Sequence, residues 1–147
     1  MKLLFLNGPN LNLLGTRPGG QAREADIYGG RSMDDLLTEL RATFAEHSID
    51  HVQSNVEGEL VNALQAAEGT CDGVVMNAAG YTHTSVAIRD TIAAISVPVV
   101  EVHISNIHAR EEFRERSITG AKCAGVITGF GLVGYRLAIE YLTTLSK

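Results

Sequence analysis

The chain has 147 residues, a formal net charge of −5 at pH 7 and 45% hydrophobic residues. This length is typical of one domain that buries a core without disulfides or metal, so we predict a single domain over residues 1–147. The acidic balance, with no lysine or arginine cluster longer than a pair, argues against nucleic acid or an anionic membrane as the partner. We therefore expect a small-molecule ligand.

Two features bear on the compartment. The apolar start at residues 3–6 is too short for a signal-peptide core or a membrane span, and polar Asn7 interrupts it. Cys71 and Cys123 show no CxxC spacing and lie in apolar segments, as reduced core cysteines do. We expect a soluble protein of the cytoplasm.

Apolar strand-like runs alternate with helix-period segments along the chain, a pattern typical of a parallel sheet covered on both faces. The runs predict five strands, at residues 2–6, 51–54, 73–76, 97–102 and 124–128. Five strands with five crossovers predict the α/β class and a flavodoxin-like three-layer fold with a five-stranded parallel sheet.

The intervening helices are predicted from caps and apolar spacing. The first begins after Ser32, which resembles a capping box with Asp35, the second ends at Gly69, and the third begins near Thr84 or Ser85. The stripes expected to face the core are Met33, Leu36, Leu37, Leu40 and Phe44; Leu60, Leu64 and Ala67; Ile88, Ile92 and Ile95; and Leu132, Tyr135, Ile139 and Leu142.

Two irregular stretches follow the carboxyl ends of strands. Residues 7–30 hold three asparagines and a glycine-rich piece, and a loop this long in a compact domain is usually functional, so we expect a lid at about residues 13–30. Residues 77–85, NAAGYTHTS, place His83 just before a helix N-terminus. An anion or a hydroxyl-rich ligand would meet free backbone amides there.

The densest polar segment is EVHISNIHAREEFR, at residues 101–114, which leaves the fourth strand. Glu101 and His103 are two residues apart on that strand and therefore share a face. The carboxylate can then set the tautomer and orientation of an imidazole that acts as a general acid or base. Zinc is the alternative, with Glu101, His103 and His108 as ligands, but the spacing fits no HExxH helix and no cysteine pair joins them.

The segment GFGLVG, at residues 129–134, matches GxGxxG between a strand and a helix. A dinucleotide fingerprint needs a further strand with an acidic residue about 20 positions on, whereas the thirteen residues after Gly134 predict only a helix. We interpret the glycines as permitting a tight turn and close helix packing.

Three segments taken together resemble the type II 3-dehydroquinate dehydratase family. They are NGPNLNLLG at residues 7–15, NAAGYTHTSVAIRD at 77–90 and EVHISNIHAREEFR at 101–114; SNVEGEL at 54–60 also fits. The resemblance covers nearly the whole chain. It implies a flavodoxin-like fold, a homo-oligomer that is a dodecamer built from trimers, no metal and no cofactor, and elimination of water from 3-dehydroquinate to 3-dehydroshikimate through an enolate.

The resemblance also implies catalytic roles. It makes Tyr28, in the lid, the base that takes the proton beside the ketone, and Arg23 the cation that activates it. Asn12 holds a water or the enolate oxygen. His103, oriented by Glu101, protonates the departing hydroxyl as a general acid.

Substrate binding is implied in the same way. Asn77 and the backbone amides of Ile104 and Ser105 meet the substrate carboxylate, while His83 and Arg114 take the ring hydroxyls. Asp90 is placed in a neighbouring subunit's active site, which would make oligomerisation part of the site.

The predicted lid is longer than is usual in the family. Counting forward from NLLGT makes Arg17 the catalytic arginine, whereas counting back from Tyr28 makes it Arg23. Tyrosine has an ordinary pKa of about 10, so ionising it at pH 7 takes roughly 4 kcal/mol, which a close guanidinium can supply. We therefore favour Arg23. Val56 and Ala25 also depart from the family, where histidine and proline are common.

Two other classes of function compete with the dehydratase interpretation. A non-catalytic flavodoxin-like module that binds a flavin or nucleotide is supported by the fold alone. A response-regulator-like interaction domain is disfavoured, because phosphoryl chemistry needs an acidic cluster after the first strand, where this chain has the amides Asn7, Asn10 and Asn12.

Overall fold

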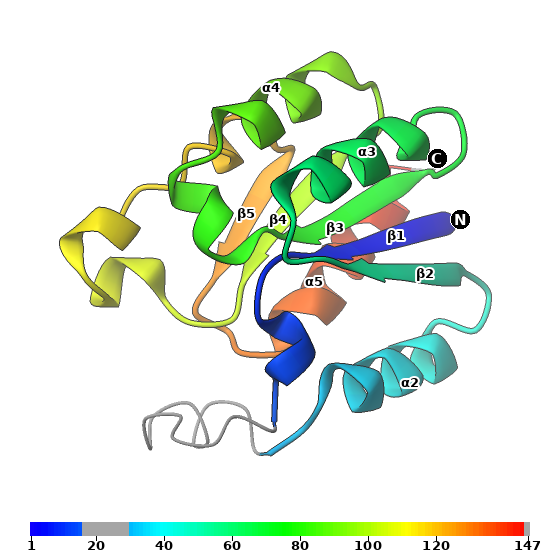
Figure 1. The fold of residues 1–147 in the computed structure, drawn as a ribbon. Coiled ribbons are helices and arrows are strands. Elements are labelled where there is room, and N and C mark those ends of the chain that lie inside the picture. Colours follow the sequence, from blue (N-terminus) through cyan, green and yellow to red (C-terminus); the bar gives the residue numbers. More distant parts are fainter. Residues whose placement is uncertain (16–29, 146–147) are drawn as a thin grey trace.

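The computed structural model describes residues 1–15 and 30–145, which form a five-stranded parallel sheet between two layers of helices (Figure 1). The sheet order is β2-β1-β3-β4-β5, and every pairing is parallel. This order confirms the predicted flavodoxin-like fold. The strands are β1 (Lys2–Asn7), β2 (Ser48–Gln53), β3 (Gly73–Asn77), β4 (Val99–His103) and β5 (Gly125–Thr128).

The helices divide the core into two halves. In the described residues the α-helices are α2 (Met33–Thr43), α3 (Glu57–Ala67), α4 (Val86–Ala94) and α5 (Val133–Thr144). Helices α2 and α5 pack on one face of the sheet, and α3 and α4 on the other. Alternation along β1 feeds both halves, because Leu3 and Phe5 join the first cluster while Leu4 and Leu6 join the second.

The predicted helix starts are confirmed. The Ser32 side chain accepts from the backbone N–H of Asp35 while the Asp35 carboxylate accepts from that of Ser32, which is a complete capping box for α2. Ser85 caps α4, with its Oγ accepting from the backbone N–H of Ile88 at 2.9 Å. The side chains of Leu60, Leu64, Ala67, Ile88, Ile92, Leu132, Tyr135, Ile139 and Leu142 are buried as expected.

Two predicted features are wrong. Strand β2 begins at Ser48, three residues before the predicted start, because it is an edge strand in which Ile49 alone is fully buried and the apolar pattern is correspondingly weak. The expectation of five crossovers also fails, because five parallel strands are joined by four connections. Strands β4 and β5 are joined without an α-helix, through the short 3₁₀ turns η3 (Ile107–Ala109), η4 (Glu112–Arg114) and η5 (Gly120–Lys122).

The glycines of GFGLVG have the structural role that was predicted for them. Gly129 and Gly131 have φ of +89° and +60°, a region that suits glycine, and they form the turn between β5 and α5. A Cβ on Gly134 would lie 3.1 Å from Val102 Cγ1, so the absence of a side chain lets α5 pack closely on β4.

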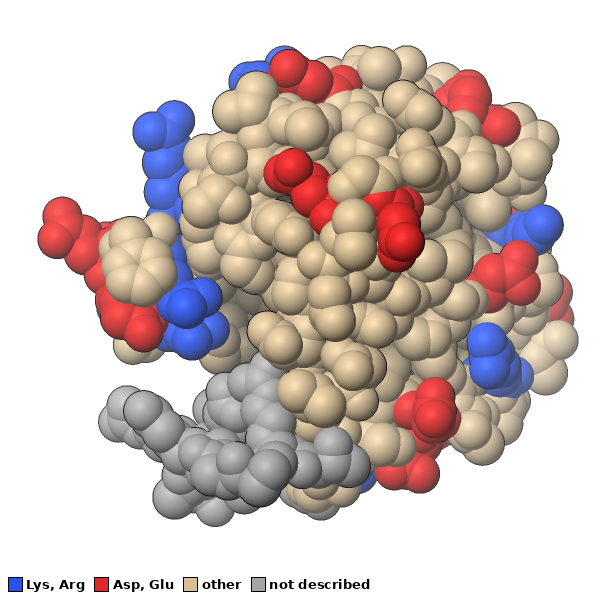
Figure 2. Space-filling model, viewed as in Figure 1, with Lys and Arg blue, Asp and Glu red and all other residues tan. Residues whose placement is uncertain are grey.

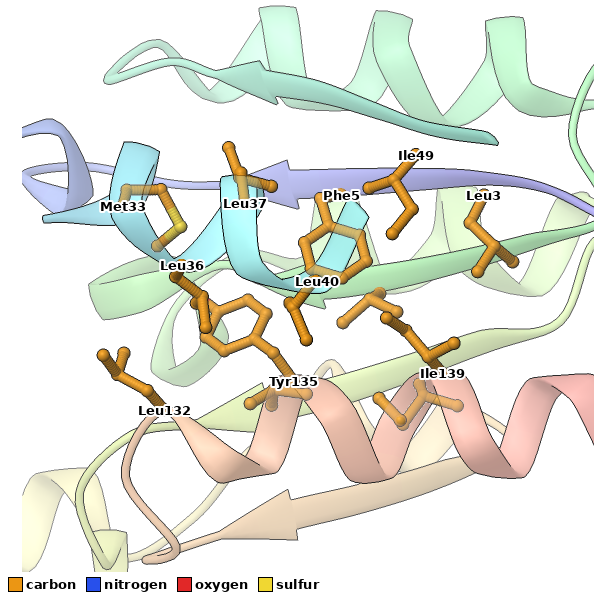
Figure 3. Close-up of a cluster of buried hydrophobic side chains, with 14 of the residues drawn as sticks. Leu3, Phe5, Met33, Leu36, Leu37, Leu40, Ile49, Leu132, Tyr135 and Ile139 are labelled. Atoms are coloured by element: carbon orange, nitrogen blue, oxygen red, sulfur yellow. The ribbon is translucent and has the colours of Figure 1, made fainter. Parts of the chain in front are cut away.

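Tyr135 is buried in the core between the sheet and helices α2 and α5, where its ring stacks on that of Phe5 with centroids 5.6 Å apart (Figure 3). Its hydroxyl makes two buried hydrogen bonds. The Tyr135 hydroxyl donates to Asn7 Oδ1 at 2.9 Å and accepts from Asn77 Nδ2 at 3.1 Å. It therefore joins α5 to the carboxyl ends of β1 and β3. No helix among residues 1–15 and 30–145 is long and apolar enough to cross a membrane.

Candidate active site

A cleft of about 280 Å³ opens at the carboxyl ends of β3 and β4, the edge where open α/β sheets bind ligands. The β3 end contributes Asn77 and the turn after it contributes His83. His103 contributes from β4, and Ile104, Ser105, Ile107, Arg110 and Arg114 follow it in the chain. The cleft therefore gathers side chains from two of the three segments that the sequence singled out, and Pro9, Asn10 and Leu11 add the third.

Glu101 and His103 form a buried pair at the end of β4. Their side chains are 0% and 6% exposed, and His103 Nε2 lies 2.6 Å from Glu101 Oε1. An ionised carboxylate only accepts, so the Nε2–H donates to it. That contact sets the tautomer of His103 and leaves its Nδ1 available to a ligand. The spacing of the two residues on the strand had predicted this orientation of the imidazole by the carboxylate.

Two hydroxyls from the β4–β5 connection complete the shell around Glu101. Ser117 Oγ donates to Oε1 at 2.5 Å, and Thr119 Oγ1 donates to Oε2. Burial pushes the pKa of Glu101 up, but the hydrogen bond and charge of His103 and the two hydroxyls outweigh it, and the pKa lies below its ordinary value. Glu101 is consequently a carboxylate at neutral pH.

His83 lies against His103. The two rings stack with centroids 6.4 Å apart and planes inclined by 22°. His83 Nδ1 lies 2.8 Å from the backbone carbonyl of Arg116, so Nδ1 carries the hydrogen and donates. The neutral ring then has its Nε2 as an acceptor, which suits a hydroxyl donor on a ligand.

Two arginines give the cleft its positive charge. Arg110 Nε and Arg114 Nε lie 3.6 Å and 3.1 Å from the same carboxylate oxygen, Glu111 Oε2. A single carboxylate opposes the two guanidiniums, which leaves the local balance positive. On the face shown in Figure 2, acidic and basic side chains lie together on the protruding β4–β5 connection, whereas the acidic groups near the centre of the view have no basic side chain beside them.

The other predicted site residues do not line the cleft, and some of them lie outside the described residues. Asn12 is exposed on η1 (Leu11–Leu13), at the start of the predicted lid. Asp90 is exposed on α4, where its carboxylate lies 3.3 Å from Arg89 Nη1. Tyr28, Arg23 and Arg17 lie outside the described residues, as does most of the predicted lid.

The zinc alternative can be compared with the geometry. Glu101 and His103 are engaged with each other, whereas His108 is exposed. Within residues 1–15 and 30–145, no three His, Cys, Asp or Glu side chains are grouped so that they could hold a metal ion.

A second cavity, of about 320 Å³, lies between α2 and α5. Its arginines are already neutralised, because Arg31 pairs with Glu39, and Arg136 Nε lies 2.9 Å from Glu140 Oε1. It has no buried titratable pair comparable to Glu101 and His103 among its lining residues. The cleft at the strand ends is therefore the candidate active site.

Comparison with known proteins agrees with this assignment. The family model for class II dehydroquinases matches residues 1–143. The chain belongs to the class II dehydroquinase family. This dehydroquinase is 54% identical over 143 residues to a protein of Exiguobacterium sp. named 3-dehydroquinate dehydratase, with 97% of this chain and 94% of the relative covered. It is 52% identical to one of the same name from Fusobacterium nucleatum, with 97% and 96% covered.

The fold comparison gives the same family. A type II dehydroquinase crystal structure from Butyrivibrio crossotus matches this dehydroquinase with a TM-score of 0.88 and 42% identity, over 97% of both chains. At this identity the likeness extends beyond the general flavodoxin-like architecture.

Sequence reasoning did not find three of the groups around the dyad. Thr82, Ser117 and Thr119 were not singled out, because isolated serines and threonines are common in loops and only the folded chain brings these three together. Tyr135 was predicted as part of an apolar stripe, and its ties to Asn7 and Asn77 were likewise missed.

The lowered pKa of Glu101 predicts a pH-dependent contribution to stability. Its ionised form stabilises the fold fully above the ordinary value of 4.5, and this contribution is lost as the pH falls through 4.5 towards the lower folded-state pKa. We expect Glu101→Gln to reduce the free energy of unfolding at pH 7 by roughly 1–3 kcal/mol and to flatten its acid dependence. Urea unfolding at a series of pH values measures both.

Glu115→Gln is the matched control, because it removes the same charge at an exposed position of the β4–β5 connection. It should keep the acid dependence of the unchanged protein. An equal pH dependence in the unchanged protein and Glu101→Gln would contradict the assignment.

Proposed function

We propose that this dehydroquinase is a 3-dehydroquinate dehydratase, a hydro-lyase that converts 3-dehydroquinate to 3-dehydroshikimate through an enolate and without a cofactor. The observation that carries the proposal is the buried pair of Glu101 and His103, 2.6 Å apart, at a strand end that lines a positively charged cleft. It supplies an oriented proton donor next to a place for an anionic substrate.

Tyr28 takes the proton beside the ketone in this proposal. A tyrosine performs this step at neutral pH only when a cation stabilises its phenolate. Arg23 is assigned that part, since it is five positions from Tyr28 in the sequence. Asn12, at the root of the same segment, holds a water or the enolate oxygen.

His103 supplies the second proton of the elimination. With Nε2 engaged by Glu101, the ring delivers a proton to the departing hydroxyl from Nδ1. The carboxylate stabilises the imidazolium before the transfer and keeps the ring in place. Expulsion of the hydroxyl as water then completes the elimination.

The remaining cleft residues orient the substrate. Asn77 and the backbone amides of Ile104 and Ser105 are assigned to the substrate carboxylate, and Asn77 is supported by its tie to Tyr135. His83, whose Nδ1 donates to a carbonyl, offers Nε2 as an acceptor for a ring hydroxyl. Arg114, which also lines the cleft, is likewise assigned to the ring hydroxyls of the substrate.

The reaction belongs to the shikimate pathway of aromatic amino acid biosynthesis, or to quinate breakdown, since the chemistry is identical in both. We place the enzyme in the cytoplasm. Its two cysteines, Cys71 and Cys123, are both free, which suits the reducing conditions there.

Purified protein should convert 3-dehydroquinate with no added metal or cofactor, as followed by the ultraviolet absorbance of the conjugated enone product. Tyr28→Phe and His103→Ala should each lower kcat by at least about a hundredfold, because each removes a proton-transfer group. His47→Ala, at a histidine distant from the cleft, is the control and should keep full activity. A colourless wild-type protein without activity would refute the proposal, and a yellow one would favour flavin binding.

Two variants separate the candidate activating arginines. Arg23→Ala should cut turnover by orders of magnitude and shift the acidic limb of the rate profile to higher pH, since an uncompensated Tyr28 ionises less readily. Arg17→Ala should do neither. Rate profiles of the two variants against pH measure the difference, and the reverse result would make Arg17 the activating residue.

We further propose that the enzyme assembles as a dodecamer built from trimers, with Asp90 of one subunit reaching the active site of its neighbour. The exposed position of Asp90 on α4 leaves its carboxylate accessible to a neighbouring chain. Light scattering should give the mass of twelve chains, and Asp90→Ala should lower activity more than Asp50→Ala, an exposed control on β2. A fully active stable monomer would contradict both parts of the proposal.

A further inference from the structure

We infer that Thr119 and Ser117, supported by Thr82, are positioning residues. They hold the Glu101 carboxylate in the orientation that lets it accept from His103 Nε2. The inference rests on the proposed dehydratase function and extends it to three hydroxyl side chains. None of them lines the cleft. They act on the reaction only through Glu101.

The contacts around Glu101 define the arrangement. Oε1 accepts from His103 Nε2 at 2.6 Å and from Ser117 Oγ at 2.5 Å, while Oε2 accepts from Thr119 Oγ1. Among the residues that the structure describes, Thr119 is thus the one hydrogen-bond donor to Oε2, and its hydrogen bond opposes rotation of the carboxylate about its terminal bond. Behind it, Thr82 Oγ1 lies 2.6 Å from Thr119 Oγ1.

One assignment of the hydrogens in this cluster suits an ionised Glu101. Each hydroxyl has a single hydrogen, and Ser117 and Thr119 use theirs on the carboxylate. Ser117 Oγ accepts from the backbone N–H of Gly120 at 2.9 Å, and Thr119 Oγ1 accepts from Thr82. A protonated Glu101 would instead donate to one of these hydroxyls and reverse the direction of the chain, since Thr82 Oγ1 also lies 3.2 Å from Ser117 Oγ. The three donors to the carboxylate, His103, Ser117 and Thr119, favour its ionised form.

The local backbone explains why these hydroxyls reach Glu101. The backbone N–H of Ile118 donates to the carbonyl of Thr82 at 2.9 Å, which fastens the β4–β5 connection to the turn after β3. Ser117 and Thr119, on either side of Ile118, then both reach the carboxylate. A Cβ on Gly120 would lie 2.9 Å from Ser117 Oγ and 3.1 Å from Glu101 Oε1, so glycine leaves room for the cluster.

The titratable groups near the cluster are few. His103 on β4 and Cys123, next to β5, interact electrostatically with Glu101, and His83 stacks on His103. Burial and then the Glu101 charge raise the pKa of Cys123, which keeps that thiol neutral. Glu101 is therefore the group whose titration the hydroxyls influence.

The experiment compares two substitutions of Thr119 with one elsewhere. Thr119→Val removes the hydroxyl at nearly constant shape, Thr119→Ser restores it, and Thr91→Val makes the same change at a buried threonine that bonds within α4. We expect kcat to fall about tenfold in Thr119→Val, with the acidic limb of kcat/KM moved to higher pH. Thr119→Ser should recover both, and Thr91→Val should change neither.

A double substitution tests whether Thr119 acts through Glu101. If it does, adding Thr119→Val to Glu101→Gln leaves kcat and the pH profile of Glu101→Gln unchanged. If the two substitutions lower kcat by factors that multiply, the inference is overturned. It is also overturned if active Thr119→Val and Thr91→Val enzymes have the same kcat and the same pH profile.

The inference and the proposed function can fail separately. An inactive wild-type protein refutes the function, whereas the titration of His103 followed by NMR reports on the dyad without substrate. In that measurement the acidic step of the pair should move to higher pH in Thr119→Val and return in Thr119→Ser. An unchanged titration would refute the inference.

Discussion

The geometry of the candidate active site depends on the burial of one carboxylate. Glu101 has no exposed surface, and a charge removed from water is stable only where donors satisfy its oxygens. His103 provides one donor from the same strand, and Ser117 and Thr119 provide two from the next connection. The contacts that stabilise this buried charge also fix the His103 ring, so local stability and the orientation of the imidazole depend on the same carboxylate.

The need for hydrogen-bond donors to Glu101 gives a physical reason for the connection between β4 and β5, which contains 3₁₀ turns and no α-helix. An α-helix there would cover the sheet but would spread successive side chains around its axis. The irregular path instead brings Ser117 and Thr119 to Glu101, and its 3₁₀ turns carry Arg114 to the cleft. The connection thus forms a wall of the site. Strand β5 is less covered as a result, with Val126 44% exposed.

Much of the fold followed from periodicity and from pairs of residues close in sequence. The helical stripes, the capping box of Ser32 and Asp35, and the shared face of Glu101 and His103 are all local patterns. They are confirmed, except that Phe44 and Ile95 lie just beyond their helices and are only partly buried. The start of β2 was predicted three residues late, since an edge strand has no strong apolar signal. The 3₁₀ turns between β4 and β5 were not foreseen, because no periodic pattern had been assigned to that connection.

The sequence by itself determined the order of strands and helices, the family, and the candidacy of Glu101 and His103, since each depends on local spacing or on long motifs. Only the tertiary structure decided what surrounds them. Thr82 and Thr119 are 37 positions apart, and their hydroxyls lie 2.6 Å from each other. No local pattern encodes such a contact, because it arises when the chain packs a buried charge and must supply each of its oxygens with a donor.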